Sequence, residues 1–130
     1  MIPALFSVSY AGFWGQSALS LTDFIARAGQ LGFESVMIAG KRPHLSPLDA
    51  LPELVHQVND ALASARVRCD VIAGYTNLSQ PSGVGSEVPH LEFQIAYVES
   101  LCRIAAQVGA KIVRIFTPYD VVGQVSLVLW

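Results

Sequence analysis

Two stretches of this sequence have nearly the same form: Gln30-Leu-Gly-Phe-Glu-Ser-Val-Met-Ile38 and Gln107-Val-Gly-Ala-Lys-Ile-Val-Arg-Ile115. In each stretch a glycine follows apolar residues at helical spacing, in the position where a left-handed residue ends a helix. A short apolar run, typical of a buried strand, begins within a few residues of that glycine. The repeated order of helix, glycine and strand predicts parallel strands joined by right-handed helical crossovers.

The same unit extends along the rest of the chain. The first predicted helix begins at Ser20, whose hydroxyl can accept from a free amide, and Asp23 places negative charge in the first turn. A second helix is predicted to begin at Ser46 and Pro47, a cap followed by a proline. A third helix is expected over residues 89–108, and strands are expected over residues 4–10, 34–39, 67–73 and 111–116.

Apolar residues at helical spacing mark the faces that the later helices are expected to bury. In the second helix this stripe consists of Leu48, Leu51, Leu54, Val55, Val58 and Leu62. In the third helix it includes Phe93, Ala96, Tyr97, Leu101, Ile104 and Ala105. The two cysteines, Cys69 and Cys102, fall in a predicted strand and a predicted helix, and we interpret both as buried thiols in a reducing compartment.

Four predicted strands alternating with three helices are half of the units in a (β/α)₈ barrel. We therefore predict an α/β protein in which residues 1–120 form the N-terminal half of a TIM barrel, followed by an apolar tail at residues 121–130. A complete barrel needs about 250 residues, so we expect the second half to be missing and the chain end to be truncated or aberrant. The alternative, a complete flavodoxin-like domain, would need a fifth strand and a final helix, for which the tail is too short.

The composition excludes several classes of protein. Hydrophobic residues make up 52% of the chain and charged residues 14%, which is too apolar for disorder and fits strands buried on both faces. The net charge of −2 provides no basic surface for nucleic acid. No uncharged apolar run is long enough to span a membrane, and the N-terminus lacks the positive residues of a secretory signal. We therefore expect a cytoplasmic protein without a membrane or nucleic-acid partner.

Two segments carry a family resemblance. Leu19-Ser-Leu-Thr-Asp-Phe-Ile-Ala-Arg-Ala-Gly-Gln-Leu-Gly-Phe-Glu-Ser-Val-Met-Ile38 is similar to the first helix and second strand of xylose isomerase-like TIM barrels. Ala106-Gln-Val-Gly-Ala-Lys-Ile-Val-Arg-Ile-Phe116 resembles the segment that leads into strand four of that superfamily. The superfamily holds sugar-phosphate isomerases and epimerases, inosose dehydratase-like proteins and endonuclease IV, and the likeness covers roughly residues 4–120.

The resemblance implies an active site at the carboxyl ends of the strands, as in other TIM barrels. It also implies a divalent metal (Mn, Mg, Zn or Co) held by two Glu, an Asp and a His in a full-length parent. Those ligands mostly come from later strands than this chain contains. We therefore assign no metal ligand, no cofactor and no catalytic residue to this chain.

Loops that leave the strands should gather on one face, so their polar residues are the candidate substrate contacts. His44 could orient a sugar hydroxyl, or it could be a loop histidine bonded to backbone. Arg42, with Lys41, could bind a phosphate or carboxylate, or the two could be ordinary solvated charges. Trp14, with Phe13, could form a wall against a sugar face or pack under the barrel rim.

The third and fourth strands add further candidates. Tyr75 could wall the pocket and Asn77 could hydrogen-bond a substrate hydroxyl, although asparagine is also a common turn residue. Arg114, inside the fourth predicted strand, needs a partner if it is buried. We expect a structural ion pair with Glu34 or Asp70 rather than a catalytic role. Asp120 is a further polar residue in the fourth exit, and His56 and His90 are expected in the outer layer.

The resemblance implies a fragment of a sugar or sugar-phosphate isomerase or epimerase. In such an enzyme carboxylates move a proton beside a carbonyl while a metal polarises the oxygens. The isolated chain is expected to be inactive because the metal-binding half is expected to be absent. The alternative is a half-barrel that assembles with itself through its open sheet edges, as a non-catalytic binding or structural homo-oligomer.

Overall fold

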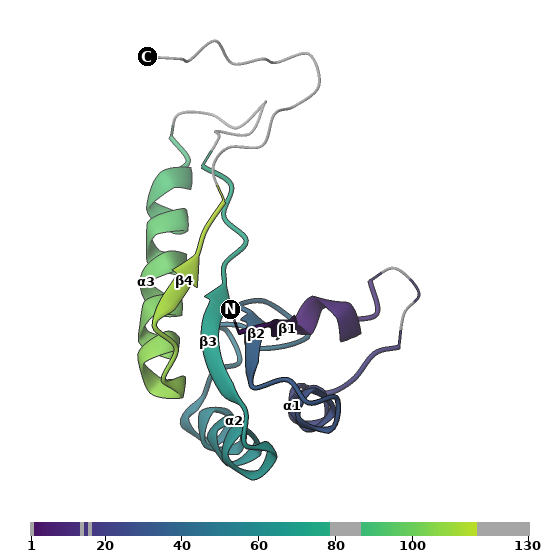
Figure 1. Cartoon of the computed structure of the whole chain (residues 1–130). Helices are drawn as coiled ribbons and strands as arrows, with labels where there is room; N and C mark the ends of the chain where they lie inside the picture. The colour runs from purple at the N-terminus through teal and green to yellow at the C-terminus, as the bar shows by residue number, and fades with distance from the viewer. Residues whose placement is uncertain (1, 14, 16, 79–86, 117–130) are drawn as a thin grey trace.

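The computed structural model describes residues 2–13, 15, 17–78 and 87–116 of the chain (Figure 1). Trp14, Asp120 and the apolar tail at residues 121–130 lie outside the described residues. Among the described helices, none combines the length and the apolar character needed to cross a bilayer. The elements, in chain order, are β1 (Ala4–Phe6), a 3-10 helix η1 (Ser7–Tyr10), α1 (Leu21–Gln30), β2 (Ser35–Ala39), α2 (Pro52–Ala65), β3 (Arg68–Ala73), α3 (His90–Val108) and β4 (Ile112–Arg114).

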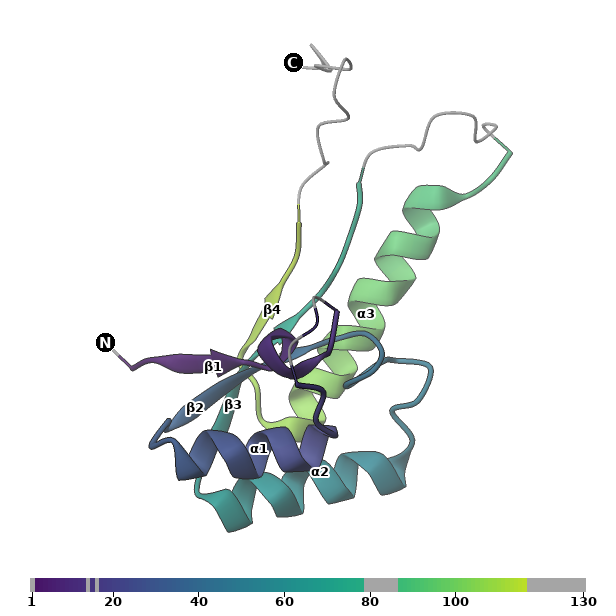
Figure 2. The ribbon, with the colours of Figure 1, turned by 90° about the vertical axis from the view of Figure 1, so that its right-hand side faces the viewer.

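The strands form one parallel sheet in the order β1-β2-β3-β4, so each strand pairs with the next one in the chain. The helices α1, α2 and α3 form an outer layer along one side of this sheet, as Figures 1 and 2 show. Parallel strands that alternate with helices in this way confirm the predicted N-terminal half of a (β/α)₈ barrel. The order leaves β1 and β4 as the two edges of the sheet.

The register of the strands decides which side chains share the inner face of the sheet, away from the helices. At the carboxyl ends of the strands, Ala39 of β2 is aligned with Ala73 of β3, and Ala73 is aligned with Arg114 of β4. Because side chains alternate between the two faces of a strand, Arg114 lies on the same face as the aligned residues two positions earlier in the strands. That row consists, in strand order, of Phe6, Met37, Val71 and Ile112.

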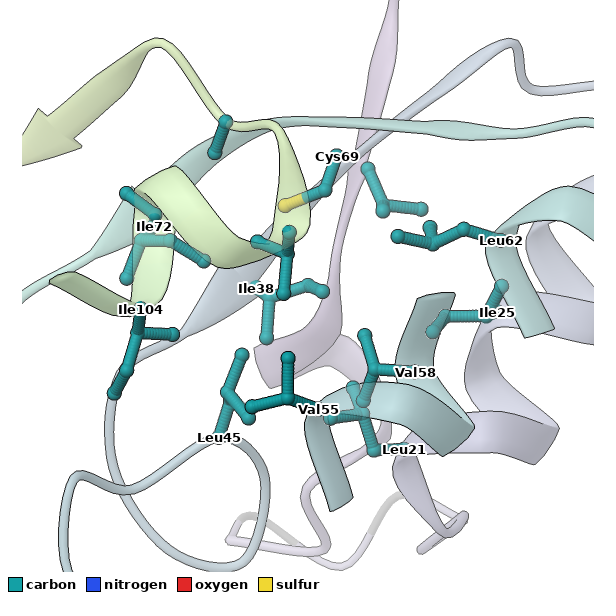
Figure 3. Packing of buried hydrophobic residues seen from close by; sticks show 14 of the residues in the cluster. Leu21, Ile25, Ile38, Leu45, Val55, Val58, Leu62, Cys69, Ile72 and Ile104 are labelled. Atoms are coloured by element: carbon teal, nitrogen blue, oxygen red, sulfur yellow. The ribbon is translucent and has the colours of Figure 1, made fainter. Parts of the chain in front are cut away.

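The core lies between the sheet and the helices, and Figure 3 shows its packing. Val36, Ile38 and Ile72 of the strands are fully buried there. Each buried aliphatic side chain of this size contributes about 1.5–3 kcal/mol relative to an exposed one. The fully buried helix residues that pack in the same cluster are Phe24, Ile25, Ala28, Val58 and Leu101.

The start of the second helix differs from the prediction. α2 begins at Pro52 with Leu51 at its N-cap, whereas Ser46 and Pro47 lie in a preceding turn. The Ser46 hydroxyl accepts a hydrogen bond from the Leu48 amide at 3.3 Å and so stabilises this turn. Both Pro47 and Pro52 would be favourable at the first position of a helix, and it is Pro52 that occupies this position. As a result Leu48 and Leu51, expected in the buried stripe, are 78% and 67% exposed.

Part of the predicted apolar face of α3 is also exposed. Phe93 is 60% exposed and Ala96 is exposed, because the N-terminal part of α3 extends beyond α1 and α2 (Figure 2). Cys102 is exposed as well, which corrects the prediction of a buried thiol. One helical residue turns the side chain by about 100°, so Leu101 faces the sheet and its neighbour does not. Cys69 is buried as predicted, and burial raises the pKa of its thiol to about 12.

The first strand is shorter than predicted. β1 ends at Phe6, and the residues from Ser7 to Tyr10 form η1. The cause is the fully buried Ser7, whose hydroxyl oxygen accepts a hydrogen bond from the Ala39 amide of β2 at 2.9 Å. This bond satisfies the amide that would otherwise need the next rung of a strand ladder.

The predicted ends of the first and third helices are confirmed. Ser20 caps α1 by accepting a hydrogen bond from the Asp23 amide at 3.2 Å. Gly32 and Gly109 follow α1 and α3 with φ of +82° and +76°, values that glycine adopts without strain. The repeated helix-glycine-strand unit therefore has the local geometry that its sequence predicts.

Candidate functional site

Side chains from all four strand ends meet at the carboxyl edge of the sheet. Phe6 is the last residue of β1 and Arg114 is the last residue of β4. Lys41 is the second residue after β2, and Tyr75 is the second residue after β3. We call these four residues, together with Phe13 and Phe116, the rim cluster.

Cations and aromatic rings alternate within the rim cluster. The Lys41 ammonium nitrogen lies 4.0 Å from the ring centroid of Tyr75 and 4.5 Å from that of Phe13. The Arg114 guanidinium carbon lies 4.4 Å from the ring centroid of Phe116, 5.2 Å from that of Phe6 and 5.7 Å from that of Tyr75. All five distances are within the range in which a ring face attracts a cation. Tyr75 thus connects the two cations.

Arg114 does not form the ion pair that the sequence led us to expect. Within the described residues Asp70 is bonded instead to the Ser35 hydroxyl at 2.6 Å and to Arg68 at 3.4 Å. The Ser35 hydroxyl and then Arg68 lower the pKa of the Asp70 carboxyl. The reason is the register: Arg114 is aligned with Ala73, three residues beyond Asp70 along β3, or roughly 10 Å.

The guanidinium of Arg114 therefore carries unused hydrogen-bonding capacity. Its Nε is buried and has no hydrogen-bond partner in the described part of the chain. Neither Lys41 nor Arg114 belongs to any of the ion pairs formed among the described residues. Ring faces offset part of the cost of keeping these charges out of water, but they accept no conventional hydrogen bonds from them.

A buried threonine fixes the end of β4 against the loop that follows β3. The Thr76 hydroxyl donates to the Phe116 carbonyl at 2.7 Å and accepts from the Phe116 amide at 2.8 Å. Thr76 itself is fully buried. Because this pair of bonds continues the β3–β4 alignment past Arg114, the aromatic ring of Phe116 is held beside the guanidinium.

The chemistry that this arrangement allows is anion recognition. An ammonium and a guanidinium without carboxylate partners donate strong hydrogen bonds to a phosphate or carboxylate. The ring faces between them offer apolar area of the kind that packs against the face of a sugar ring. A hollow of about 580 Å³ opens beside Lys41 and Tyr75, between the loop after β2 and α3, and provides room for a small molecule.

His44 does not lie in the rim cluster. It is 3% exposed and its ring stacks on Phe24 of α1, with centroids 6.1 Å apart. Neither ring nitrogen has a hydrogen-bond partner among the described residues. Burial lowers the pKa of His44, and the nearby Leu19 backbone opposes this only in part. The structure thus places His44 between the loop after β2 and α1 as a neutral, packed imidazole.

The other predicted substrate contacts have different surroundings. Arg42 forms two hydrogen bonds of 2.6 Å with Asp49 of the same loop, which holds the pKa of the Asp49 carboxyl below its usual range. Asn77 is tied to α3 through its backbone, because its amide donates to Gln94 and its carbonyl accepts from His90. Of the candidates named from the sequence, the rim cluster brings together Tyr75, Lys41, Phe13 and Arg114, whereas Arg42, His44 and Asn77 lie outside it.

The described residues do not fit the metal site that the resemblance implies. Within the described ranges, no three His, Cys, Asp or Glu side chains come together in a group that could hold a metal ion. The two strongest cations of the strand ends, Lys41 and Arg114, would also disfavour a divalent cation between them. The described strand ends therefore present cations rather than a set of metal ligands.

The sequence contains a signal for the rim cluster that the search for polar loop residues passed over. β2 and β3 end on the same tripeptide, Ile38-Ala-Gly40 and Ile72-Ala-Gly74, and the next residues are Lys41 and Tyr75. Equal positions after neighbouring parallel strands predict neighbouring side chains. Phe6 and Phe116 give no comparable signal, because an aromatic residue at a strand end is most often part of a core.

The parallel half-barrel, its outer helices and the cluster at its carboxyl edge define the class of this chain as the N-terminal half of a TIM barrel. The particular structure that it resembles is the crystal structure of AsbF from Bacillus anthracis, a probable 3-DHS dehydratase involved in petrobactin synthesis. The TM-score is 0.65 at 19% sequence identity, and the match covers 89% of this chain and 38% of that chain.

This likeness confirms the half-barrel fold that the resemblance implies. This chain spans well under half of the length of that structure. No family model matches the sequence, and no curated protein matches it closely enough to be called a relative.

Proposed function

We propose that this chain forms the substrate-binding wall of a TIM-barrel enzyme that acts on a small, hydroxylated anion such as a sugar phosphate. The observation that carries the proposal is the pairing of Lys41 and Arg114 around the ring of Tyr75 at the carboxyl ends of the strands. Active sites of TIM barrels lie at that end. The two cations would hold the phosphate or carboxylate, and the ring would pack against the carbon skeleton.

Isomerisation or epimerisation is the reaction that we propose for a full-length parent, in the cytoplasm and with a divalent metal. AsbF, a probable dehydratase, supports a small-molecule enzyme but does not favour the isomerase reaction in particular. The chain studied would bind substrate without turning it over, because the acid–base carboxylates and the metal would come from outside it. Metal-dependent isomer formation from a sugar phosphate by the purified 130-residue chain would contradict this.

Binding can be measured with little ambiguity because the chain has only two lysines, Lys41 and Lys111. Protein labelled with ¹³C at the lysine side chains should give two resolvable sets of NMR signals. We expect glucose 6-phosphate to shift the Lys41 signals with millimolar affinity and to leave those of Lys111 in place. Glucose should bind more weakly, and inorganic phosphate should separate binding of the charge from binding of the sugar.

Substitutions identify the groups that hold the anion. Lys41→Met and Arg114→Met should each weaken binding of glucose 6-phosphate at least tenfold, because a hydrogen bond to a charged group contributes about 1.5–3 kcal/mol. Lys111→Met, the matched control, should not change the affinity. Equal affinities for all three variants, or no movement of the Lys41 signals at any ligand concentration, would refute an anion site here.

A second candidate function is self-assembly into a larger barrel. The observation that favours it is exposed apolar surface along the β4 edge, where Ile112 is 55% exposed and Ile115 is 48% exposed. Beside Ile115, an apolar hollow of about 490 Å³ runs along α3 past Ile95, which is 50% exposed. Within the described residues the outer edges of β1 and β4 pair with no other strand, which would allow one copy to continue the sheet of another.

Light scattering during size-exclusion chromatography tests this second candidate. We expect a dimer or larger species whose fraction rises with protein concentration, and Ile115→Lys should shift it toward monomer. The matched change Leu48→Lys, on an exposed leucine far from β4 in the chain, should not do so. A monomer at all concentrations would exclude self-assembly.

A further inference from the structure

A single hydroxyl of α3 links the two strand ends that carry Lys41 and Tyr75. Tyr97 donates a hydrogen bond to the carbonyl of Gly40 at 2.8 Å and accepts one from the amide of Tyr75 at 3.2 Å. Gly40 is the residue immediately before Lys41. The Tyr97 hydroxyl therefore fixes the backbone on both sides of the contact between the Lys41 ammonium and the Tyr75 ring.

Apolar packing one turn further along α3 supports the same two strand ends. A Cβ added to Gly40 or to Gly74 would lie 2.5 Å or 2.8 Å from the side chain of Leu101, so a larger residue at either position would displace Leu101. The ladder also continues here, because the Gly40 amide donates to the Ala73 carbonyl at 2.8 Å. Gly40 and Gly74 thus pack against Leu101, and the loops leave this packed region at Lys41 and Tyr75. The hydrogen bonds of the Tyr97 hydroxyl are made at this point.

We infer that Tyr97 is a positioning residue, whose hydroxyl holds Lys41 and Tyr75 in the mutual geometry that binds an anion. The role in binding rests on the proposed function, whereas the role in geometry does not. Burial raises the pKa of Tyr97, so its hydroxyl stays protonated and able to donate to Gly40 through the neutral range. Without the hydroxyl, the Gly40 carbonyl and the Tyr75 amide lose these bonds, and the two loops are released from each other.

The test is Tyr97→Phe in protein labelled with ¹³C at its two lysines. In the wild type, stacking between two rings should move the Lys41 side-chain signals upfield of those of Lys111. Tyr97→Phe should remove at least half of this difference and weaken binding of glucose 6-phosphate about tenfold, the change expected for loss of one hydrogen bond. Unchanged Lys41 signals and affinity in a folded Tyr97→Phe variant would overturn the inference.

Two control variants separate positioning from general stability. Ser100→Ala removes another hydroxyl that lines the same hollow but donates within α3, to the Ala96 carbonyl. Leu101→Val loosens the core beneath the loops and retains the Tyr97 hydroxyl. Both variants should keep the Lys41 shift, even though Leu101→Val lowers the unfolding temperature. If Leu101→Val reproduces the Tyr97→Phe spectrum, the role of Tyr97 is only structural.

A measurement on the wild type covers the case in which Tyr97→Phe does not fold. The Tyr75 amide, bonded to the Tyr97 hydroxyl, should exchange with solvent deuterium far more slowly than an unbonded loop amide. Rapid exchange at Tyr75 would overturn the inference. The two proposals can also fail separately. If the wild type does not bind glucose 6-phosphate but Tyr97→Phe still loses the upfield shift of the Lys41 signals, the proposed function is refuted and the positioning role stands.

Discussion

Lys41 and Arg114 approach the same aromatic ring: the Lys41 ammonium lies 4.0 Å and the Arg114 guanidinium carbon 5.7 Å from the centroid of Tyr75. The two cations are separated by 73 positions in the sequence (114 − 41) and belong to the ends of β2 and β4. The shared ring offsets part of their repulsion, and an anion between them would offset more. Affinity for anions should therefore depend on this ring.

Replacing Tyr75 tests that dependence. Tyr75→Leu should lower stability by about 1 kcal/mol, since it removes two cation–π contacts of about 0.5–1 kcal/mol each and leaves some apolar contact. Tyr75→Phe keeps the ring and should retain most of the stability and the upfield position of the Lys41 signals. Urea denaturation and lysine NMR measure these quantities. A Tyr75→Leu variant as stable as the wild type, with unmoved Lys41 signals, would argue against the ring contacts.

The buried His44 predicts how stability depends on pH. Burial lowers its pKa in the folded protein, so below its ordinary value of 6.5 the unfolded chain binds more protons than the folded one. The free energy of unfolding should therefore fall as the pH drops below about 6.5, until the lowered pKa is passed. His44→Phe should remove this loss and add about 1 kcal/mol at pH 7, because two unsatisfied buried nitrogens disappear.

The control for the pH experiment is His56, which is exposed and lies 3.4 Å from Asp60 on α2. His56→Gln should retain the fall in stability between pH 6.5 and pH 5. Urea denaturation at a series of pH values provides the data. If His44→Phe shows the same slope over this interval as the wild type, His44 is not the group responsible.

The glycines that end β2 and β3 should differ in their tolerance of alanine. At Gly40 the severe clash of an added Cβ is with the end of the Leu101 side chain at 2.5 Å, and the Ala73 carbonyl oxygen lies at 3.3 Å, whereas at Gly74 the Arg114 carbonyl oxygen lies at 2.9 Å. We expect Gly40→Ala to cost about 1–2 kcal/mol and Gly74→Ala to cost about 3 kcal/mol or more. Thermal unfolding measures both.

Leu101→Ala provides the matched background for this comparison. It is itself destabilising by about 2–5 kcal/mol, since Leu101 is fully buried. In that background Gly40→Ala should become nearly neutral, because its obstacle is gone, whereas Gly74→Ala should remain costly. Additive losses at Gly40 would contradict the close packing of α3 on the end of β2.

The two cysteines should differ in reactivity. Cys69 is buried with its pKa raised to about 12, and Cys102 is exposed on α3. At pH 8 iodoacetamide should modify Cys102 within minutes and should reach Cys69 only after unfolding, because the thiolate is the reactive form. Mass spectrometry of the intact protein should show one added group before denaturant and two after it. The Cys102→Ser variant should remain unmodified in the folded state.

The exposed ion pair of Arg42 and Asp49 should have little effect on stability. Two nitrogens of the Arg42 guanidinium each lie 2.6 Å from an oxygen of the Asp49 carboxylate, yet the Arg42 side chain is 67% exposed. Arg42→Met should leave stability almost unchanged, because solvent screens an exposed ion pair. Because its guanidinium is already bonded to Asp49, the same change should leave anion affinity as it is. Weaker binding in Arg42→Met would restore Arg42 as a substrate contact.

Local signals predicted most of the elements and failed where two of them competed. The N-cap at Ser20 and the glycines after α1 and α3 act within one turn of the chain, and each is found where the sequence places it. Ser46-Pro47 and Leu51-Pro52 both resemble a helix start, and the sequence alone ranks the capped one higher. Packing decides for Pro52, because α2 buries Val55, Val58 and Leu62 against the sheet from there.

The candidate site was less accessible to sequence reasoning, because only Lys41 and Tyr75 share a local pattern, the position after an Ile-Ala-Gly tripeptide. Tyr75 could be chosen as a polar side chain after a strand. Arg114 was a candidate too, but it was expected in an ion pair with Glu34 or Asp70, because its actual neighbours depend on the alignment of β4 with β3. A one-residue shift in that alignment would turn Arg114 toward the helices and dissolve the rim cluster.

The sequence by itself determined the repeated helix-glycine-strand unit, and with it a parallel sheet and half of a TIM barrel, because these depend on hydrophobic periodicity and on residues that act over a few positions. Only the tertiary structure decided that Lys41, Tyr75 and Arg114 meet, that Tyr97 ties two of their loops together, and that His44 is packed away from them. The physical reason is that the register between strands and the packing of α3 on Gly40 and Gly74 bring together residues from four separate strand ends.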